Sequence, residues 1–383
     1  MKNILFINSS SDLYGADRSL LRTVKGLKDK YHFSVCLPYD GPLREELENI
    51  GVQTFVFDLG VLRRKFFTPL GIFKYAYNLI SSIRAIRAII EKDNIDIIHT
   101  NTSAVLAGAV AAKLSKIQHV WHIREIIKSP RIVRKYISYV VNKFSGTVIG
   151  VSRSTIENLK IDQPSIASKC IVIHNGIEVE KYHNPIDQPN ILKSELQLNN
   201  DSIIVGMVGR ISHWKGQDLF LKVAKRIVSG DKNVHFIAVG SPFEGQEWRE
   251  SDLLKEVENS NLSENFHLVP FRNDIADVLY SFDIFIMPST LPDPFPTTVL
   301  EAMSTSRPII GNDHGGTSEM IVSNKSGILV EPNNVNQMAS AVENLVQDHE
   351  LRKYLGKNAL ERVEENFSYE SYLIKMSDLY GSL

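Results

Sequence analysis

Short apolar runs and amphipathic stretches alternate along the first half of the chain. Runs rich in β-branched and aromatic residues predict buried strands, and stretches with apolar positions three or four residues apart predict helices. Strands are expected at residues 3–8, 32–38, 53–58, 95–100, 119–123, 146–152 and 170–177, and helices at 19–28, 42–51, 73–94, 104–116 and 132–144. This alternation is typical of a doubly wound parallel α/β sheet.

The second half repeats the pattern. Strands are expected at residues 202–209, 235–240, 265–271, 283–289 and 307–312, with a helix at 217–228 and further helices between the later strands. Pro185 and Pro189 break the pattern and mark a linker. We therefore expect two Rossmann-like domains, at residues 1–180 and 181–365. Neither half contains G-x-G-x-x-G, which argues against an NAD-dependent dehydrogenase.

Composition places the chain among cytoplasmic globular proteins. It has 383 residues, of which 43% are apolar and 23% charged. The first apolar run predicts a strand and not a signal peptide, and the run at 104–112 is too short to span a membrane. Cys36 and Cys170 are the two cysteines. They fit a reducing compartment better than a disulfide framework.

The first candidate site is the segment DPFPTTVLEAM, which follows an expected strand. Ligands of parallel α/β sheets bind at the carboxyl ends of the strands. Proline suits the first positions of a helix, so a helix should begin near Pro296 and leave the N–H groups of Thr297 and Thr298 without intrahelical acceptors. Such groups form an anion site. Asp293 and Glu301 flank them, although two acids that merely cap a helix are the structural alternative.

The second candidate site is the segment GRISHWKGQDLF, which lies between an expected strand and an expected helix. Arg210 and Lys215 flank its short loop and can point at the same anion. Two cations that converge on phosphate oxygens would stabilise a diphosphate leaving group. Two solvated loop cations are the alternative.

Three weaker signals follow other strands. In DLYGADRSLL, Gly15 would let the backbone approach a phosphate at the start of a helix. In HVWHIRE, His122 is expected just past a strand end, although a lone histidine is more often structural. In NDHGGTSEM, at residues 312–320, paired glycines are expected to expose their amides before a helix.

Taken together, these segments resemble a known family over essentially the whole chain. The chain resembles the retaining glycosyltransferases of family 4, which have the GT-B fold of two Rossmann-like domains facing a deep cleft. The family's E-x7-E element resembles Asp293-x7-Glu301, and its G-R-x4-K-G element is matched by Arg210 and Lys215. The final segment, at residues 366–383, resembles the helix that crosses back to the first domain.

The resemblance also implies roles for the matched residues. Asp293 would contact hydroxyls of the donor sugar, Glu301 the ribose, and Arg210 with Lys215 the diphosphate. His122 would lie near the donor sugar and the acceptor. The implied catalytic residues are His122, Arg210, Lys215 and Asp293, and the implied donor-binding residues are Gly15, Phe271, Arg272, Phe295, Thr297, Thr298 and Glu301.

Two departures from the family pattern concern the donor site. The first acid is Asp293, where the family usually has glutamate, and Pro296 stands where it usually has glycine, which removes one N–H group. Both changes put the identity of the donor sugar in doubt more than the activity. The loop PFRND, at residues 270–274, matches the loop that touches the base.

The implied reaction is transfer of a hexose-type sugar from a UDP- or GDP-sugar to an acceptor hydroxyl with retention of anomeric configuration. The resemblance implies no cofactor and no metal, and the sequence has no D-x-D motif. No residue is an obvious covalent nucleophile. Same-face attack, with a donor phosphate oxygen taking the acceptor proton, is the expected mechanism.

Charge is segregated along the chain, although the net charge is only −1. Residues 1–182 contain 26 Lys and Arg against 16 Asp and Glu, and residues 60–145 contain 15 against 4. Basic and aromatic residues alternate in two segments, at 61–77 and 128–144; the first holds Arg63, Arg64, Lys65, Phe66, Phe67, Phe73 and Tyr77. This pattern predicts contact with an anionic membrane surface. A solvated surface that binds no partner is one alternative. A nucleic-acid partner is another, but the sequence contains no nucleic-acid-binding motif.

The expected protein is thus a peripheral enzyme at the inner face of the cytoplasmic membrane. Its acceptor would be a glycan or a lipid-linked oligosaccharide in surface-polysaccharide assembly. Two other enzymes of the same fold compete: a nucleotide-sugar epimerase, which needs no acceptor, and a phosphorylase, which needs a pyridoxal lysine and a longer chain. A non-catalytic scaffold is the remaining alternative, and the presence of Arg210, Lys215 and Glu301 argues against it.

Overall fold

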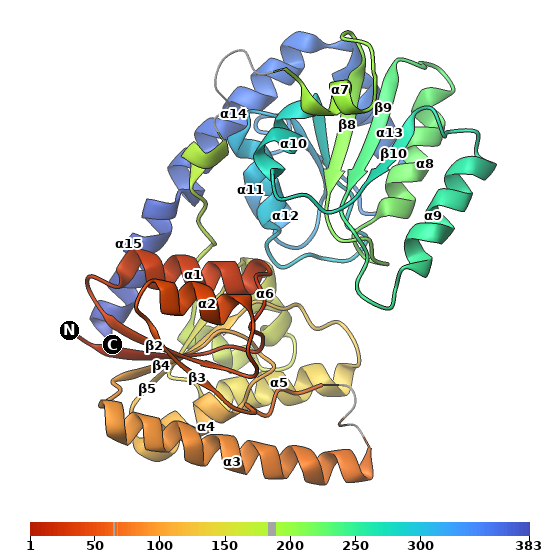
Figure 1. Ribbon diagram of the computed structural model, residues 1–383. Coiled ribbons are helices and arrows are strands. Elements are labelled where there is room, and N and C mark those ends of the chain that lie inside the picture. Colours follow the sequence, from red (N-terminus) through yellow and green to blue (C-terminus); the bar gives the residue numbers. More distant parts are fainter. Residues whose placement is uncertain (64–65, 67, 183–188) are drawn as a thin grey trace. The chain divides into compact units, whose positions relative to one another are not determined.

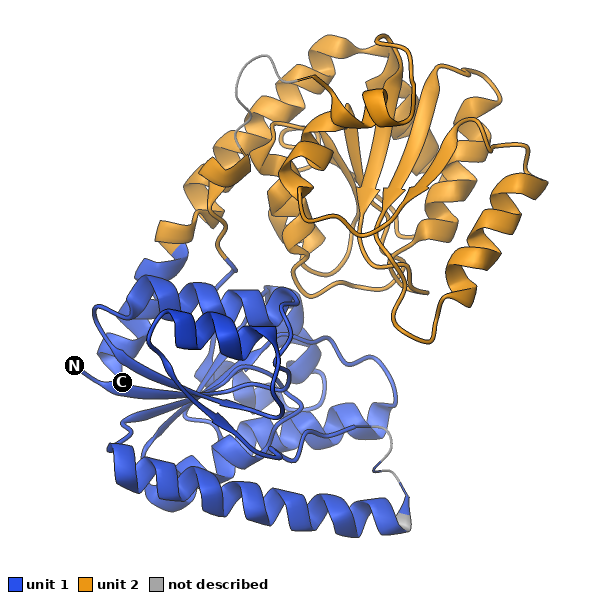
Figure 2. Cartoon of the chain, viewed as in Figure 1, with its two compact units in different colours: residues 1–175, 372–383 blue, residues 176–371 orange. Residues whose placement is uncertain are grey.

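The computed structural model (Figure 1) describes residues 1–63, 66, 68–182 and 189–383. Of the residues singled out above, Arg64, Lys65, Phe67 and Pro185 lie outside this described part. The chain divides into two compact units (Figure 2), unit 1 with residues 1–175 and 372–383 and unit 2 with residues 176–371. Each unit contains one parallel sheet, which confirms the two Rossmann-like folds expected from the sequence.

The sheet of unit 1 has the strand order β3-β2-β1-β4-β5-β6-β7. Its strands are β1 (Asn3–Ile7), β2 (His32–Leu37), β3 (Gln53–Val56), β4 (Ile97–Thr100), β5 (Gln118–Ile123), β6 (Thr147–Gly150) and β7 (Cys170–Val172). Its helices are α1 (Gly15–Leu27), α2 (Pro42–Asn49), α3 (Pro69–Asp93), α4 (Ala107–Ser115), α5 (Arg131–Phe144) and α6 (Arg153–Lys160). In Figure 1, α1 and α2 lie on one face of this sheet, and α3 and α4 lie on the other.

Helix α3 begins earlier than its apolar periodicity predicts. Thr68 is the N-cap, and its hydroxyl accepts a hydrogen bond from the Gly71 N–H at 3.1 Å. Proline follows at the first helical position, where its missing N–H costs nothing. The helix ends at Asn94, which has a left-handed φ of 50°. Capping residues, and not the apolar pattern, thus set both ends of α3.

The sheet of unit 2 has the order β10-β9-β8-β11-β12-β13. Its strands are β8 (Ile203–Val208), β9 (Val234–Val239), β10 (Phe266–Val269), β11 (Ile284–Met287), β12 (Ile309–Asn312) and β13 (Ile328–Val330). Its helices are α7 (Ile191–Glu195), α8 (Gln217–Val228), α9 (Trp248–Asn259), α10 (Ile275–Ser281), α11 (Thr297–Ser304), α12 (Thr317–Met320), α13 (Val335–Gln347) and α14 (His349–Phe367). The sequence pattern missed β13 because three residues are too few to show a period.

Helix α15 (Tyr369–Ser382) returns to unit 1 and packs beside α1. The hydroxyl of Tyr372 lies 2.5 Å from Thr23 Oγ1, and the ammonium of Lys2 donates to the carbonyl of Tyr380 at 2.9 Å. Tyr380 is fully buried. Unit 1 therefore takes its last buried side chains from a segment that is distant in sequence.

Candidate active site

The candidate site of unit 2 lies where β8 and β11 end side by side. The loop from Gly209 to Gly216 leads from β8 into α8. Gly216 has a φ of 87°, and a Cβ there would lie 2.0 Å from the carbonyl oxygen of Pro288. The backbone N–H of Thr290 also donates to the carbonyl of Trp214 at 2.8 Å. Only a glycine allows the two loops to approach this closely.

This close approach brings the first two predicted residues together. Lys215 Nζ lies 2.5 Å from Asp293 Oδ2, and the two side chains are only 21% and 13% exposed. We expected Lys215 to face a diphosphate and Asp293 to face the donor sugar. In the structure, each is the other's partner.

Arg210 lies at the other end of the same loop. Its guanidinium stacks on the Phe243 ring, 4.0 Å from the ring centroid. The buried side chain of Gln217 donates to the carbonyl of Arg210 at 3.0 Å, which fixes the loop backbone. Such stacking orients a guanidinium.

Helix α11 begins where the sequence predicts. Pro296 is the N-cap with a φ of −70°, so Thr297 and Thr298 occupy the first turn. Their N–H groups have no acceptor within the helix. Glu301 lies one turn further in and is buried. Asp293 thus lies in the connection from β11 to α11, and Thr297, Thr298 and Glu301 lie in the first two turns of α11.

The paired glycines after β12 lie against the backbone of Asp293. Gly315 has a φ of 62°, and a Cβ there would lie 2.4 Å from the carbonyl oxygen of Asp293. The N–H of Gly316 donates to that carbonyl at 2.8 Å. The expectation that both glycines expose their amides is therefore wrong for Gly316, because the backbone of Asp293 occupies it.

The residues expected at the base and the donor lie in different settings. Phe271 is 64% exposed, whereas Phe295 is buried with its ring 5.7 Å from that of Phe367. The Phe295 side chain thus contributes to packing within unit 2. Its expected contact with the donor stays a prediction.

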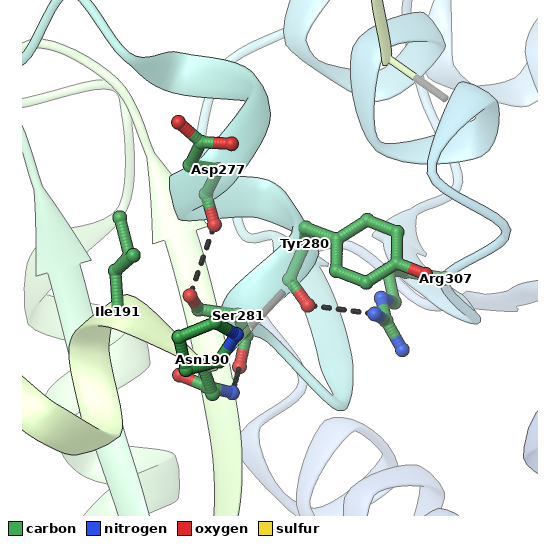
Figure 3. A pocket seen from close by; sticks show the side chains of 7 residues that line it. Asn190, Ile191, Asp277, Tyr280, Ser281 and Arg307 are labelled. Atoms are coloured by element: carbon green, nitrogen blue, oxygen red, sulfur yellow. Dashed lines mark hydrogen bonds between the residues drawn. The ribbon is translucent and has the colours of Figure 1, made fainter. Parts of the chain in front are cut away.

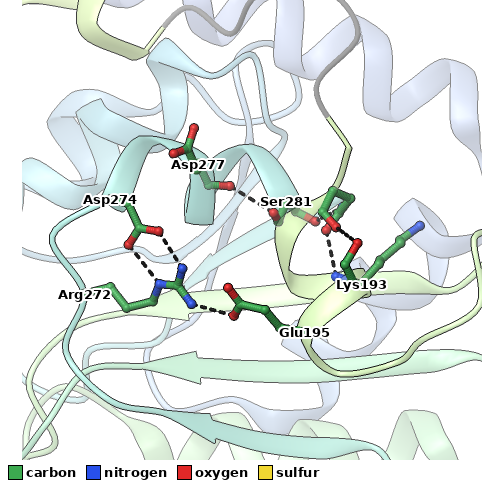
Figure 4. A network of polar contacts seen from close by, with 8 residues as sticks. Lys193, Glu195, Arg272, Asp274, Asp277 and Ser281 are labelled. Atoms are coloured by element: carbon green, nitrogen blue, oxygen red, sulfur yellow. Dashed lines mark hydrogen bonds and ion pairs between the residues drawn. The ribbon is translucent and has the colours of Figure 1, made fainter.

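Arg272 is held by two acids (Figure 4). Its guanidinium lies 2.5 Å from a carboxylate oxygen of Asp274 and 2.5 Å from one of Glu195. The Asp274 hydrogen bond, and then the Glu195 hydrogen bond, raise the pKa of Arg272. Its expected contact with the base also stays a prediction, and these two acids fix the orientation of the guanidinium.

A pocket of about 130 Å³ lies elsewhere in unit 2 (Figure 3) and contains none of the predicted residues. It is lined by Pro189, Asn190, Ile191, Asp277, Tyr280, Ser281 and Arg307. Arg307 donates to the carbonyl of Tyr280 at 2.6 Å and stacks on its ring. Ser281 and Arg307 come just before β11 and β12, so this pocket lies at the amino ends of the strands, away from Lys215 and Asp293.

In unit 1, Gly15 is the first residue of α1, which therefore begins earlier than the start at residue 19 that the apolar pattern predicts. A Cβ at Gly15 would meet nothing within 4 Å, so this side of the backbone is open. The buried carboxylate of Asp17 accepts hydrogen bonds from Asn8, from Ser10 and from the N–H of Tyr14. Burial is the largest influence on Asp17 and raises its pKa.

His122 lies within β5 and not just past its end, which corrects the sequence-based placement. The strand continues to Ile123, whose carbonyl accepts from Val151. His122 is fully buried, with Nδ1 3.2 Å from His99 Nε2 and 3.3 Å from Arg124 Nη2. Burial, and then the charge of Arg124, hold the pKa of His122 well below 6.5. The imidazole is therefore neutral.

Sequence reasoning missed several polar residues around His122. Arg124 donates to Asn101 at 2.7 Å, to Asn175 at 2.8 Å and to Ser19 at 2.9 Å. The position of Arg124 directly after a strand was a usable signal. The sequence offered no local signal for His99, because its partners come from another strand and from α15.

Three buried polar atoms in unit 2 were also missed. Within the described part of the chain, Ser212 Oγ, Ser289 Oγ and Asn312 Oδ1 have no hydrogen-bond partner. All three residues lie at or just beyond the carboxyl ends of β8, β11 and β12. Unpaired buried polar atoms are rare and often mark a site that a ligand completes.

The described residues contain no group of three or more His, Cys, Asp or Glu side chains arranged to hold a metal ion. Among the same residues, no helix combines the length and the apolar character that crossing a membrane requires.

Comparison with known proteins agrees with this geometry. Residues 14–181 match the family model described as Glycosyltransferase Family 4, and residues 189–362 match the one described as Glycosyl transferases group 1. The site and the fold therefore define a glycosyltransferase with the GT-B fold. The chain belongs to glycosyltransferase family 4, as its sequence motifs predicted.

Two relatives match most of the chain. A UDP-Gal:alpha-D-GlcNAc-diphosphoundecaprenol alpha-1,3-galactosyltransferase from Escherichia coli is 26% identical over 83% of this chain and 83% of its own. An N,N'-diacetylbacillosaminyl-diphospho-undecaprenol alpha-1,3-N-acetylgalactosaminyltransferase from Campylobacter jejuni is 25% identical over 96% of both chains. The crystal structure of HepE from Anabaena in complex with UDP and glucose has a TM-score of 0.86 at 22% identity and covers all of both chains.

Proposed function

We propose that this enzyme transfers a sugar from a UDP-sugar to a hydroxyl of a sugar carried on a polyprenyl diphosphate, with retention of configuration. The two relatives named above support this proposal, because both act on diphosphoundecaprenol-linked sugars and both form alpha-1,3 linkages. The product would be a growing surface polysaccharide. The enzyme would act from the cytoplasm at the inner face of the membrane.

The observation that carries the proposal is the ion pair of Lys215 and Asp293. A diphosphate carries more negative charge than one carboxylate and competes for the same ammonium. When Lys215 turns to the diphosphate, Asp293 loses its partner and becomes an acceptor for hydroxyls of the sugar. One loop contact thus prepares both a cation for the leaving group and an acceptor for the sugar.

The proposed chemistry assigns the remaining groups of unit 2 to the diphosphate. The bond between the anomeric carbon and the diphosphate oxygen breaks, and the acceptor oxygen bonds to the same face of that carbon. A phosphate oxygen takes the acceptor proton. Arg210, Lys215 and the N–H groups of Thr297 and Thr298 stabilise the charge that develops on the diphosphate. These cations and amides are the basis for proposing that no metal is required.

The other predicted residues keep their proposed contacts. Glu301 would accept from the ribose, and the loop with Phe271 and Arg272 would face the uracil. In unit 1, Gly15 is proposed for the diphosphate and His122 for the transferred sugar.

A membrane-facing surface on α3 and α5 is part of the proposal. The exposed large apolar residues of these helices are Leu70, Ile72, Phe73, Tyr77, Ile80, Ile132, Tyr136 and Tyr139. Lys74, Arg84, Arg131 and Lys135 are exposed on the same helices. Aromatic and basic residues on one face suit an anionic phospholipid surface, where the rings enter the interface and the cations meet phosphates. A lipid-linked acceptor would be reached from such a surface.

The proposal is tested by nucleoside diphosphate release from UDP-, GDP-, ADP- and TDP-sugars, with and without a membrane lipid extract and with a chelator present. We expect release from a UDP-sugar, stimulation by the extract and loss in Arg210→Ala. Preference for a GDP-sugar would overturn the donor assignment. Dependence on added divalent metal would overturn metal independence. A sugar trapped covalently on Asp293 would overturn the same-face mechanism.

A further inference from the structure

Three buried side chains connect α15 to His122 inside unit 1. The hydroxyl of Tyr380 lies 2.8 Å from His99 Nδ1, and His99 Nε2 lies 3.2 Å from His122 Nδ1. Tyr380, His99 and His122 are each fully buried. The three residues come from α15, β4 and β5, so the order of the contacts is fixed by packing and not by one flexible segment.

Arg124 determines which ring nitrogens of His99 and His122 carry a proton. A guanidinium can only donate hydrogen bonds, and Arg124 Nη2 lies 3.3 Å from His122 Nδ1. His122 Nδ1 is therefore an acceptor. His99 Nε2 must then carry a proton and donate to it, which leaves His99 Nδ1 to accept the proton of Tyr380. The reverse arrangement would place two donors against each other at His122 Nδ1.

The surroundings of the row keep all three groups neutral. Burial raises the pKa of Tyr380 well above 10.0, so its phenol keeps its proton. Burial lowers the pKa of both His99 and His122. Four other charged or titratable groups influence the row: Arg124 beyond β5, Tyr372 on α15, Tyr31 beside Tyr380 and His119 on β5.

A neutral His122 with an acceptor at Nδ1 carries its proton on Nε2. This Nε2 atom is buried and, within the described residues, has no hydrogen-bond partner. A buried donor without an acceptor costs about 1–3 kcal/mol, so such atoms are rare unless a ligand meets them.

We propose that Tyr380 and His99 are positioning residues that lock His122 in the Nε2–H tautomer, so that His122 donates a hydrogen bond to an oxygen of the bound sugar and does not act as a base. The proposal rests on the proposed function, because that function places a sugar at His122. Within the proposal, Tyr380 and His99 reinforce the tautomer that Arg124 sets, and His122 alone touches the substrate.

The tautomer is measured on the full-length protein with ¹⁵N-labelled histidine, without any substrate. Long-range proton–nitrogen correlation distinguishes the two ring nitrogens by their chemical shifts. We expect His122, assigned by its loss in His122→Asn, to show a protonated Nε2 and a bare Nδ1 at neutral pH. A protonated Nδ1, or a charged ring, would overturn the proposal.

The variant Tyr380→Phe tests the positioning role. Losing the phenol hydroxyl frees His99 Nδ1, so His99 should show exchange between tautomers, and His122 Nδ1 should lose one of the two donors that hold it as an acceptor. We expect kcat to fall about two- to ten-fold, the effect of one lost hydrogen bond, with unchanged affinity for the nucleoside diphosphate. Tyr31→Phe is the matched control, because its hydroxyl donates to the carbonyl of Ser377 on the same helix and touches neither imidazole. Tyr31→Phe should leave the histidine spectrum and kcat unchanged.

Two results would separate failure of this inference from failure of the proposed function. A single Nε2–H tautomer in wild type and in Tyr380→Phe, with equal kcat, would overturn the role of Tyr380. If the wild type releases no nucleoside diphosphate from any sugar donor, the proposed function fails, while the spectra of wild type and Tyr380→Phe still decide the tautomer lock.

Discussion

Lys215 and Asp293 are 78 residues apart in sequence and form an ion pair of 2.5 Å at the carboxyl ends of two adjacent strands. The pair depends on Gly216, which lets the first loop lie against the second. Under the proposed function, the two partners have separate tasks once the donor is bound. The same contact would then link the loop proposed for the leaving group to the loop proposed for the sugar.

Lys215→Met should lower kcat/KM on the order of 100-fold, because one donor to the developing charge of the diphosphate is lost. Steady-state kinetics with the donor identified by the release assay would measure this. Lys225→Met is the control, since Lys225 forms an ion pair of the same kind with Glu256, at 2.6 Å on the exposed side of α8. A comparable loss in both variants would contradict a specific role for Lys215.

Asp293→Asn should change binding of the nucleoside diphosphate and turnover of the sugar donor in opposite directions. Without the carboxylate, Lys215 is available to phosphate before any ligand arrives, so affinity for the nucleoside diphosphate should rise about two- to five-fold. Turnover of the sugar donor should fall on the order of 100-fold, because the sugar is no longer held in position. Calorimetry and turnover assays would be run on one preparation. Weaker binding of the nucleoside diphosphate would contradict the proposed exchange of partners.

Gly216→Ala should lower the free energy of unfolding by ~2–4 kcal/mol. The φ of 87° and the 2.0 Å approach of Pro288 leave no room for a methyl group. Urea titration measures the effect. Gly15→Ala is the control for stability alone, because a Cβ there meets nothing within 4 Å, and it should change the free energy of unfolding by less than ~0.5 kcal/mol. Equal free energies of unfolding for both variants would show that the loop after β8 can move away from the loop after β11 without loss of stability.

The stability of unit 1 should fall in mild acid. Burial lowers the pKa of His119 from 6.5 to about 3, so between these values the unfolded chain binds a proton that the folded chain does not. The contribution of this group is complete above pH 6.5 and declines as the pH falls toward 3, by ~1.4 kcal/mol per pH unit. Fluorescence of the neighbouring Trp121 reports the unfolding.

His119→Gln should make this decline shallower, and His32→Gln on the exposed end of β2 should leave it as in the wild type. Urea titrations at about pH 7.5 and about pH 5 would compare the three proteins. The idea fails if His119→Gln loses as much stability as the wild type over this interval.

The double variant Phe73→Ser, Ile132→Ser should bind phosphatidylglycerol vesicles at least ~10-fold more weakly than the wild type, because two apolar anchors are lost. Sedimentation with vesicles measures this. Tyr354→Ser in unit 2 is the control, since Tyr354 is also exposed. Equal binding of the wild type to neutral and anionic vesicles at low salt would contradict an anionic membrane surface.

Much of the fold was predictable because parallel sheets produce a recognisable pattern of apolar and polar residues in the sequence. Buried strands are apolar throughout, and the helices between them are amphipathic. The same pattern placed three residues after strands: Arg210, Lys215 and Asp293. Because the carboxyl ends of parallel strands lie at one edge of the sheet, these residues were expected to lie close together. Loop glycines beside these residues were visible as well.

Pairing between distant side chains was not predictable. Arg272 meets Glu195 across 77 residues, and Tyr380 meets His99 across 281, and no local period encodes either contact. The burial of His122 was also hidden, because a strand end in sequence is uncertain by a residue or two. Such contacts depend on which elements pack together, and only the three-dimensional arrangement provides that.

Helix α15 imposes an order on how the protein is made. Tyr380 stacks edge-on against Tyr31 and Phe33 and holds His99, yet the ribosome adds it after every residue of unit 2. Unit 2 is contiguous and can fold as it emerges. The first 175 residues, although synthesised earliest, have to wait with these rings uncovered until the last helix arrives. A nascent chain would thus complete unit 2 before unit 1, and chaperones that shield exposed aromatic surface should be needed by the older half of the chain.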